Sequence, residues 1–214
     1  MAENNETQDP EEVDHAKRNF LTAATAVVGA IGVCVTAIPF VTSMNPSAKA
    51  LALGGPTDMD ISKIEPGGLV KAVWRNKPIL VIQRPKPVLD QLAKNDALLR
   101  DPDSKEAQQP PYAQNAWRSI KPELLVMVNI CTHLGCSPLY VPTPGDPSVG
   151  PSWPGGFHCP CHGSLYDLAA RVFKNVPAPL NMPVPRHRYL SDTVVRIGED
   201  PIGSHSTYRG PLVW

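Results

Sequence analysis

The sequence predicts an all-β domain of antiparallel sheets with a loop-rich metal-binding part, preceded by one N-terminal transmembrane helix. Three observations lead to this prediction. The 25 prolines and few aromatic side chains among 214 residues favour short strands and ordered turns over helices. One apolar run near the N-terminus is long enough to cross a bilayer. Two loops rich in cysteine and histidine lie in the second half of the chain.

Residues 1–18 are predicted to form a disordered cytoplasmic tail. The first fifteen of them are acidic and polar, and they offer nothing to bury. A mitochondrial presequence would be rich in arginine and poor in acidic residues, so this composition favours a bacterial source.

Residues 19–41 are predicted to form a single transmembrane anchor helix. The uncharged stretch Phe20–Ile38 would span roughly 28 Å as a helix, against a hydrocarbon core of about 30 Å. Lys17 and Arg18 precede it, which predicts a cytoplasmic N-terminus and a periplasmic domain at a bacterial inner membrane. A cleaved signal peptide is the alternative, because residues 48–50 resemble a small-x-small cleavage site. The retained anchor is favoured because the run exceeds the usual h-region of about 7 to 15 residues.

Two details of this anchor bear on export. Lys17–Leu21 resembles a twin-arginine export signal in which lysine replaces the first arginine. Such signals export folded domains that already hold a cofactor. Cys34 lies within the apolar run and is interpreted as a small residue that faces lipid or packs there.

Residues 42–60 are predicted to be a flexible tether, because small and polar residues dominate and Gly54–Pro56 breaks regular structure. Ten extended residues reach at most roughly 35 Å, so such a tether would let the following domain swing between two docking sites. Composition alone leaves an inert spacer equally open.

Residues 61–214 are predicted to form the globular domain, whose short β-prone segments suit antiparallel sheets. The expected strands are Leu69–Trp74, Ile79–Gln83, Leu124–Ile130 and Val194–Ile197. The spacing of apolar residues predicts one short helix over Val88–Arg100, followed by a surface loop over Asp101–Pro111. Trp153 and Phe157 are interpreted as packing residues.

Two short loops, residues 131–136 and 159–164, carry the chemistry of the chain. The first reads Cys-Thr-His-Leu-Gly-Cys and the second reads Cys-Pro-Cys-His-Gly-Ser. Each loop supplies one cysteine and one histidine at chelating spacing, and each carries a further cysteine. A zinc site could use two of each residue but needs no second thiol pair. A thiol-disulfide oxidoreductase is disfavoured, because the second loop is one residue short of C-x-x-C and adjoins no βαβ pattern.

The two loops resemble the two boxes of a Rieske iron-sulfur protein, most closely those of the Rieske subunit of cytochrome bc complexes. The resemblance implies a Rieske-type fold that binds one [2Fe-2S] cluster per chain within residues 130–182. It implies Cys131 and Cys159 as thiolate ligands of one iron. It implies His133 and His162 as imidazole ligands of the other iron.

The same resemblance implies further roles near the cluster. It pairs Cys136 with Cys161 in a disulfide, which an oxidising periplasm would preserve. It assigns Ser164 and Tyr166 as hydroxyl donors to a cluster sulfide and to a ligand thiolate, which would raise the reduction potential. Residues 177–179 resemble the proline loop that covers the third side of the cluster.

Two positions depart from the family pattern. Val176 stands where the family usually has glycine, and Ala170 precedes Arg171 where glycine is usual. Glycine at such positions commonly supplies a positive φ or a close backbone approach. Both substitutions leave the predicted ligands untouched and bear only on the geometry of the loops.

The remaining histidines are predicted to have no role at the cluster. His158 directly precedes Cys159, but the spacing of the box gives the ligand role to His162. The others have no partner motif and are interpreted as ordinary surface residues. They are His15, His187 and His205.

The resemblance implies a membrane-embedded subunit of a quinol-cytochrome c reductase. Such a subunit accepts one electron from quinol, with proton release, and passes it to a c-type cytochrome by domain movement. The predicted catalytic residues are His162 facing quinol, His133, and Leu134 at the docking surface. The implied partners are cytochrome b and a c-type cytochrome in a dimeric complex. Nucleic acid is not expected, because 20 basic and 20 acidic side chains leave no net field.

Two alternatives remain within the same ligand chemistry. A Rieske-type ferredoxin or oxygenase component would use the same four ligands, but such proteins generally lack the extra cysteine pair and need no anchor. A subunit of a plastoquinol-oxidising complex is closer, and the long polar segment before Leu124 weakly favours the cytochrome bc type.

Overall fold

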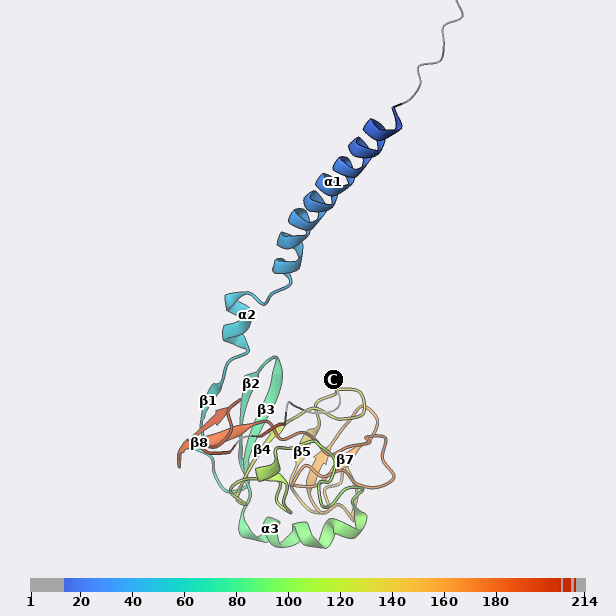
Figure 1. Cartoon of the computed structure of the whole chain (residues 1–214). Coiled ribbons are helices and arrows are strands. Elements are labelled where there is room, and N and C mark those ends of the chain that lie inside the picture. The colour runs from blue at the N-terminus through green and yellow to red at the C-terminus, as the bar shows by residue number, and fades with distance from the viewer. Residues whose placement is uncertain (1–13, 205, 209, 211–214) are drawn as a thin grey trace, which may run out of the picture. The chain divides into compact units, whose positions relative to one another are not determined.

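The computed structural model describes residues 14–204, 206–208 and 210, and it divides into two compact units, residues 1–51 and 52–214 (Figure 1). The first unit contains helix α1, His15–Ser43. Among the described residues, this is the one helix long and apolar enough to cross a membrane, and none of its apolar stretch is buried.

The anchor helix is longer at both ends than the predicted residues 19–41. The Asp14 carboxylate accepts hydrogen bonds from the backbone N–H groups of Ala16 and Lys17, at 3.0 and 3.1 Å, and caps the first turn. Residues 15–18, predicted as part of the disordered tail, are therefore helical. Residues 1–13 of that predicted tail lie outside the described residues.

The predicted tether, residues 42–60, contains more regular structure than its composition indicates. Ser43 still belongs to α1, and Ala48–Leu53 forms the short helix α2. Thr57–Asp60 forms strand β1, which pairs antiparallel with a strand near the C-terminus of the chain.

The second unit contains three antiparallel sheets of three strands each, among the described residues. Their strand orders are β1-β9-β8, β2-β3-β4 and β5-β6-β7, and Figure 1 shows β5 and β7 apart from β1, β2 and β8. The remaining strands are β2 Leu69–Trp74, β3 Lys77–Gln83, β4 Leu124–Val128, β5 Leu139–Val141, β6 Gly156–His158, β7 Leu165–Tyr166, β8 His187–Ser191 and β9 Val194–Ile197. The all-β prediction is confirmed, and the four expected strands are present with small shifts at the β3 and β4 ends.

The sheet β2-β3-β4 is buried on both faces, because β3 and β4 send alternate side chains to two different cores. Ile79 and Val81 pack with residues of β1 and β9. Leu80 and Ile82 pack with the cysteines of the two loops. Because successive side chains of a strand point to opposite faces, the sheet forms a middle layer between the two cores. The loops with the cysteines pack against one of its faces.

The segment between β3 and β4 differs from the prediction in two ways. The expected helix over Val88–Arg100 is an α-helix, α3 Lys86–Leu92, followed by a 3₁₀ helix over Ala93–Leu98. A second 3₁₀ turn covers Pro111–Ala113. The predicted surface loop over Asp101–Pro111 is partly internal, because several of its polar side chains are buried. They are Ser104, Gln108 and Gln109.

The prediction that His187 is an ordinary surface residue is wrong. Its side chain is fully buried on β8, with the rings of Tyr112 and Tyr189 edge-on at 6.0 and 6.1 Å. The His187 Nδ1 atom lies 2.8 Å from the Pro185 carbonyl oxygen. Burial lowers the pKa of His187 to about 4, so its imidazole is neutral in the folded protein at neutral pH.

The other side chains that were predicted to have no role at the two loops differ in how buried they are. Trp153 and Phe157 are buried, which confirms their packing role, and Trp153 Nε1 donates to the Val141 carbonyl at 3.0 Å. His15 is exposed at the start of α1, and His205 lies outside the described residues.

Candidate metal centre

The first loop, residues 131–136, is closed by two backbone hydrogen bonds. The Gly135 N–H donates to the Cys131 carbonyl at 3.0 Å, and the Cys131 N–H donates to the Cys136 carbonyl at 2.7 Å. Gly135 has a φ of 85°, in the left-handed region, although a Cβ there would meet no atom within 4 Å. The backbone conformation, and not the available space, therefore favours glycine at this position.

The second loop, residues 159–164, repeats this geometry at the same spacing. The Gly163 N–H donates to the Cys159 carbonyl at 3.0 Å, and the Cys159 N–H donates to the Ser164 carbonyl at 2.8 Å. Gly163 has a φ of 73°. Two equivalent turns thus each present a cysteine at their first position and a histidine two or three residues later.

The structure brings the four predicted ligand residues together. Cys131 and Cys159 are each only 1% exposed. The rings of His133 and His162 lie edge-on, with centroids 4.7 Å apart. His133 is half-buried, and its Nδ1 atom is buried without a hydrogen-bond partner among the described residues. A buried imidazole nitrogen without a partner is costly unless a further group binds it, so the set fits a cluster with sulfur and nitrogen ligands.

The thiol of Cys159 is protonated more readily than an ordinary cysteine. Burial raises the pKa of this thiol, and the neighbouring Cys131 raises it further. The Cys159 thiol therefore favours its neutral form. Binding of a metal would displace its proton, so the affinity of such a site rises with pH.

A disulfide joins the two loops. Cys136 and Cys161 are bonded to each other across a sequence separation of 25 residues, as the predicted pairing requires. The Sγ atoms of Cys136, Cys159 and Cys161 lie within 4.8 Å of one another. Since two of these atoms form the disulfide, the trio is not a three-thiolate metal site. The disulfide instead lies beside the Cys159 thiol.

Tyr166 lies within hydrogen-bond distance of one predicted ligand. Its hydroxyl donates to the Cys131 Sγ atom at 3.2 Å and accepts from the Thr132 N–H at 3.1 Å. The side chain is fully buried on β7, and burial raises the pKa of the Tyr166 hydroxyl, which therefore stays protonated as a donor. This geometry suits the predicted hydrogen bond to a ligand thiolate.

Comparison with known proteins agrees with this geometry. Residues 97–186 match the family model described as Rieske [2Fe-2S] domain, and residues 7–47 match the one described as Ubiquitinol-cytochrome C reductase Fe-S subunit TAT signal. The ubiquinol-cytochrome c reductase iron-sulfur subunit of Allochromatium vinosum is 57% identical over 188 residues, which are 88% of this chain and 91% of that protein. The chain belongs to this family. It carries a Rieske domain, whose cofactor is a [2Fe-2S] cluster.

Two further relatives have the same name. The iron-sulfur subunit of Blastochloris viridis is 44% identical over 183 residues, which cover 85% of this chain and 92% of that protein. The subunit of Rhodospirillum rubrum is 42% identical over 199 residues, which cover 92% of this chain and 100% of that protein. The similarity therefore extends over the anchor as well as the Rieske domain.

The proline loop, residues 177–179, and the residue after it, Leu180, are hydrogen-bonded to the two cluster loops. The Ala178 N–H donates to Ser164 Oγ at 3.0 Å, which leaves the buried Ser164 hydroxyl proton free to donate elsewhere. The Thr132 hydroxyl donates to the Leu180 carbonyl at 2.6 Å. Sequence reasoning missed Thr132. The available clue was its position, since Thr132 carries a hydroxyl group between the predicted ligands Cys131 and His133.

The two departures from the family pattern have different outcomes. Ala170 has a φ of 60°, so it adopts the conformation that glycine usually supplies there. Val176 does not have a positive φ, and its neighbour Asn175 does, at 59°. Asparagine tolerates this region better than a β-branched residue, so the positive φ of this segment lies at Asn175 and not at Val176.

The exposed end of the two loops is formed by three predicted catalytic residues. Leu134 is 72% exposed, His162 is exposed, and His133 is half-buried beside them. His158 lies on β6, half-buried. An exposed leucine beside an exposed histidine gives a surface on which an apolar ring with a polar edge can bind.

Proposed function

We propose that this chain is the electron-accepting subunit of a quinol-cytochrome c oxidoreductase. In this role it accepts one electron from quinol, with proton release, and passes the electron to a c-type cytochrome by movement of its Rieske domain. The observation that carries the proposal is the meeting of two buried cysteines and two histidines, one of them exposed, at the end of two equivalent loops. The relatives named above are ubiquinol-cytochrome c reductase subunits.

In this proposal Cys131 and Cys159 hold one iron, while His133 and His162 hold the other. Two neutral imidazoles in place of two thiolates make the cluster less negative, and it accepts an electron at about −150 to +300 mV, against about −400 mV for a plant-type ferredoxin. The Tyr166 hydrogen bond to the Cys131 sulfur favours added negative charge on that sulfur. This range suits oxidation of a quinol.

His162 is the proposed proton acceptor. Its side chain is exposed, so the ring nitrogen that does not bind iron can accept a hydrogen bond and then the proton of a quinol hydroxyl. Leu134, which is 72% exposed, would pack against the quinol ring or the docking surface of a partner. The buried and unpaired Nδ1 atom of His133 is suited to bind iron.

The remaining partners follow from electron counting and from the anchor. One [2Fe-2S] cluster takes a single electron, so the second quinol electron has to go to another cofactor, which we assign to cytochrome b of the same dimeric complex. Helix α1 would hold the chain in the bacterial inner membrane, and Lys17 and Arg18 favour a cytoplasmic N-terminus with the Rieske domain in the periplasm. The disulfide and α1 together disfavour a ferredoxin or oxygenase component.

Electron paramagnetic resonance of dithionite-reduced membranes that contain the full-length chain tests the cofactor. We expect the spectrum of a [2Fe-2S] centre with mixed nitrogen and sulfur ligands. A spectrum typical of four thiolate ligands, or metal analysis without iron and inorganic sulfide, would contradict the ligand set.

The His162→Cys variant tests the catalytic role. It should abolish quinol oxidation, because a thiolate cannot replace the proton-accepting imidazole. The matched control is His158→Gln, which changes a half-buried histidine four residues away and should keep turnover. Quinol oxidation by His162→Cys at the wild-type rate would show that the box was assigned wrongly.

A further inference from the structure

Three buried arginines converge on the turn that follows the second cluster loop. This turn, residues 167–171, begins directly after Tyr166. The Arg84 Nη1 atom, from the end of β3, donates to the Leu168 carbonyl at 3.0 Å. Arg171 belongs to the turn itself. The side chains of Arg84, Arg118 and Arg171 are at most 2% exposed, and we call them the arginine clamp.

Arg118 connects this turn to the segment that follows the proline loop. Its Nη1 atom donates to the carbonyls of Ala169, Ala170 and Met182, at 3.2, 3.1 and 2.8 Å. Its Nη2 atom donates to Gln109 Oε1 at 2.9 Å. The residue comes from the long segment between β3 and β4, which sequence reasoning left without a role, so Arg118 is one of the side chains through which this segment reaches the cluster-binding part.

The backbone at this contact is held in an uncommon conformation. Arg118 has a φ of 50° and Ala170 has a φ of 60°, and both residues are fully buried. Left-handed conformations of residues other than glycine persist only where the surroundings fix them. The hydrogen bonds of Arg118 supply such a constraint at the point where the turn and the segment after the proline loop meet.

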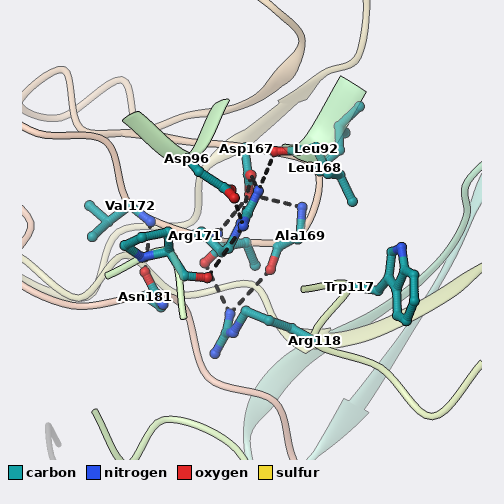
Figure 2. Close-up of polar contacts among 12 residues, drawn as sticks. Leu92, Asp96, Trp117, Arg118, Asp167, Leu168, Ala169, Arg171, Val172 and Asn181 are labelled. Carbon is teal, nitrogen blue, oxygen red and sulfur yellow. Dashed lines mark hydrogen bonds and ion pairs between the residues drawn. The ribbon is translucent and has the colours of Figure 1, made fainter. Parts of the chain in front are cut away.

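Arg171 is surrounded by two carboxylates (Figure 2). Its Nε atom donates to Asp167 Oδ2 at 2.9 Å, and its Nη1 atom donates to Asp96 Oδ1 at 2.7 Å. Asp167 is fully buried, whereas the Asp96 side chain is 49% exposed. Arg171 also donates from Nη2 to the Leu92 carbonyl at 2.7 Å, so the turn is fixed to α3.

The buried charges of the clamp do not cancel. Among the described residues, the buried charged side chains are the three arginines and Asp167, which gives 3 − 1 = +2. Burial lowers the pKa values of Arg84 and Arg118 to about 10, and both groups remain charged at neutral pH. Asp96 neutralises part of this charge from a half-exposed position, where water screens it.

The clamp lies close to the predicted ligands. Ala170 and Met182, whose carbonyls accept from Arg118, belong to the same buried core as Cys131, Cys159 and Tyr166. The interior has a low effective dielectric constant, so a charge there acts on its neighbours more strongly than a surface charge does. Positive charge near a redox centre favours the reduced state, which carries one more electron.

We propose that the arginine clamp raises the reduction potential of the cluster, with Arg118 as a positioning residue that also fixes the turn against the segment after the proline loop. The inference rests on the proposed ligand set. It adds to the hydrogen bond of Tyr166 a second, purely electrostatic contribution, two of whose three arginines, Arg84 and Arg118, come from the segment between β3 and β4.

The test is an electron paramagnetic resonance redox titration of the full-length protein in membranes, with thermal unfolding measured in parallel. Arg118→Met removes the charge at similar length and should lower the equilibrium constant for reduction by roughly threefold to tenfold. A tenfold change equals about 59 mV for one electron. Arg118→Lys keeps the charge with fewer donors, so it should lower the unfolding midpoint while the potential stays near that of the wild type.

Asp96→Asn provides the opposite change at a half-exposed site. The asparagine oxygen can still accept from Arg171, but the negative charge is gone, so the potential should rise by a smaller amount. The matched controls are Asp192→Asn, at a side chain 97% exposed in the turn between β8 and β9, and Arg196→Met on β9. Both controls should keep the wild-type potential.

Unchanged potentials in both Arg118→Met and Asp96→Asn, with the cluster signal present, would overturn the inference and leave the clamp a purely structural feature. If Arg118→Met loses its cluster, the reduction potential of Asp96→Asn becomes the deciding measurement. The Asp96 side chain is already partly in water, so this change disturbs the buried core less. A wild-type chain without the expected cluster spectrum would instead refute the proposed function, so the two failures are distinguishable.

Discussion

Removal of the disulfide between the two cluster loops should destabilise the Rieske domain strongly. The bond joins Cys136 to Cys161 and is the one covalent link between the two loops, which are otherwise held by hydrogen bonds such as Tyr166 to Cys131 and by their shared core. The variant with both cysteines changed to serine keeps the size of the side chains and prevents disulfide exchange. The predicted ligands at Cys131 and Cys159 are unchanged in it.

The expected magnitude follows from the length of the closed ring. With the sequence separation of 25 residues, the loop-closure entropy corresponds to about 3.5 kcal/mol of stability at 25 °C. For a domain of this size, such a loss lowers the thermal midpoint by roughly 7 to 14 °C. The cluster should also be lost faster in the variant, because the loops can separate in the folded domain.

The assay is thermal unfolding of the purified full-length protein, followed by tryptophan fluorescence, together with the visible absorbance of the cluster. Cys34→Ser is the matched control. It removes the exposed cysteine in α1, and it should leave the midpoint unchanged. A double variant that unfolds at the wild-type temperature and keeps its cluster would show that the backbone bonds and the core hold the two loops without the disulfide.

Two further predictions concern buried side chains. Tyr166→Phe removes the hydrogen bond to Cys131 Sγ, so the reduction potential should fall while the cluster stays bound, and an unchanged redox titration would exclude this role. The second prediction concerns His187, whose pKa is about 4 in the folded state and 6.5 in the unfolded state. As the pH falls, the unfolded state therefore binds the proton first. The free energy of unfolding should decrease as the pH drops from about 6.5 to 4. Full protonation would cost about 3 kcal/mol, and His187→Phe should make urea unfolding depend less on pH across this window. If the pH dependence of urea unfolding is the same in His187→Phe as in the wild type, other titrating groups dominate that dependence.

The sequence was most informative where a local pattern has one structural meaning. The strands Leu69–Trp74 and Val194–Ile197 were predicted at their observed bounds, because alternating apolar residues between turns leave few other conformations. The Cys136–Cys161 disulfide followed from the family resemblance, and the structure contains it. The meeting of the four predicted ligand residues agrees with the resemblance, while their ligand roles stay a prediction.

The sequence was least informative where polar residues are buried. His187 was interpreted as a surface residue, and Arg118 was given no role, since neither has a partner nearby in the sequence. Their partners come from distant segments, as with the carbonyls of Ala170 and Met182 for Arg118. Burial of such groups depends on tertiary hydrogen bonds that no local periodicity encodes. The same reason explains why the supposed surface loop over 101–111 is partly internal.

The structure also limits which part of the predicted tether could permit the proposed domain movement. Trp74 Nε1 donates to the Gly55 carbonyl at 2.7 Å, and Arg75 Nε donates to the Gly54 carbonyl at 2.8 Å. Beyond them β1 pairs with β9, so residues 54–60 have to move with the domain.

Between α1 and this attachment, only residues 44–47 lack regular structure, and they can extend at most about 14 Å. A larger displacement would require helix α2 to unwind. An isolated helix of six residues is marginally stable in water. Unwinding of α2 would lengthen this segment from about 9 Å to about 20 Å. The reach of the domain would then be set by the stability of α2 and not by a uniformly flexible linker.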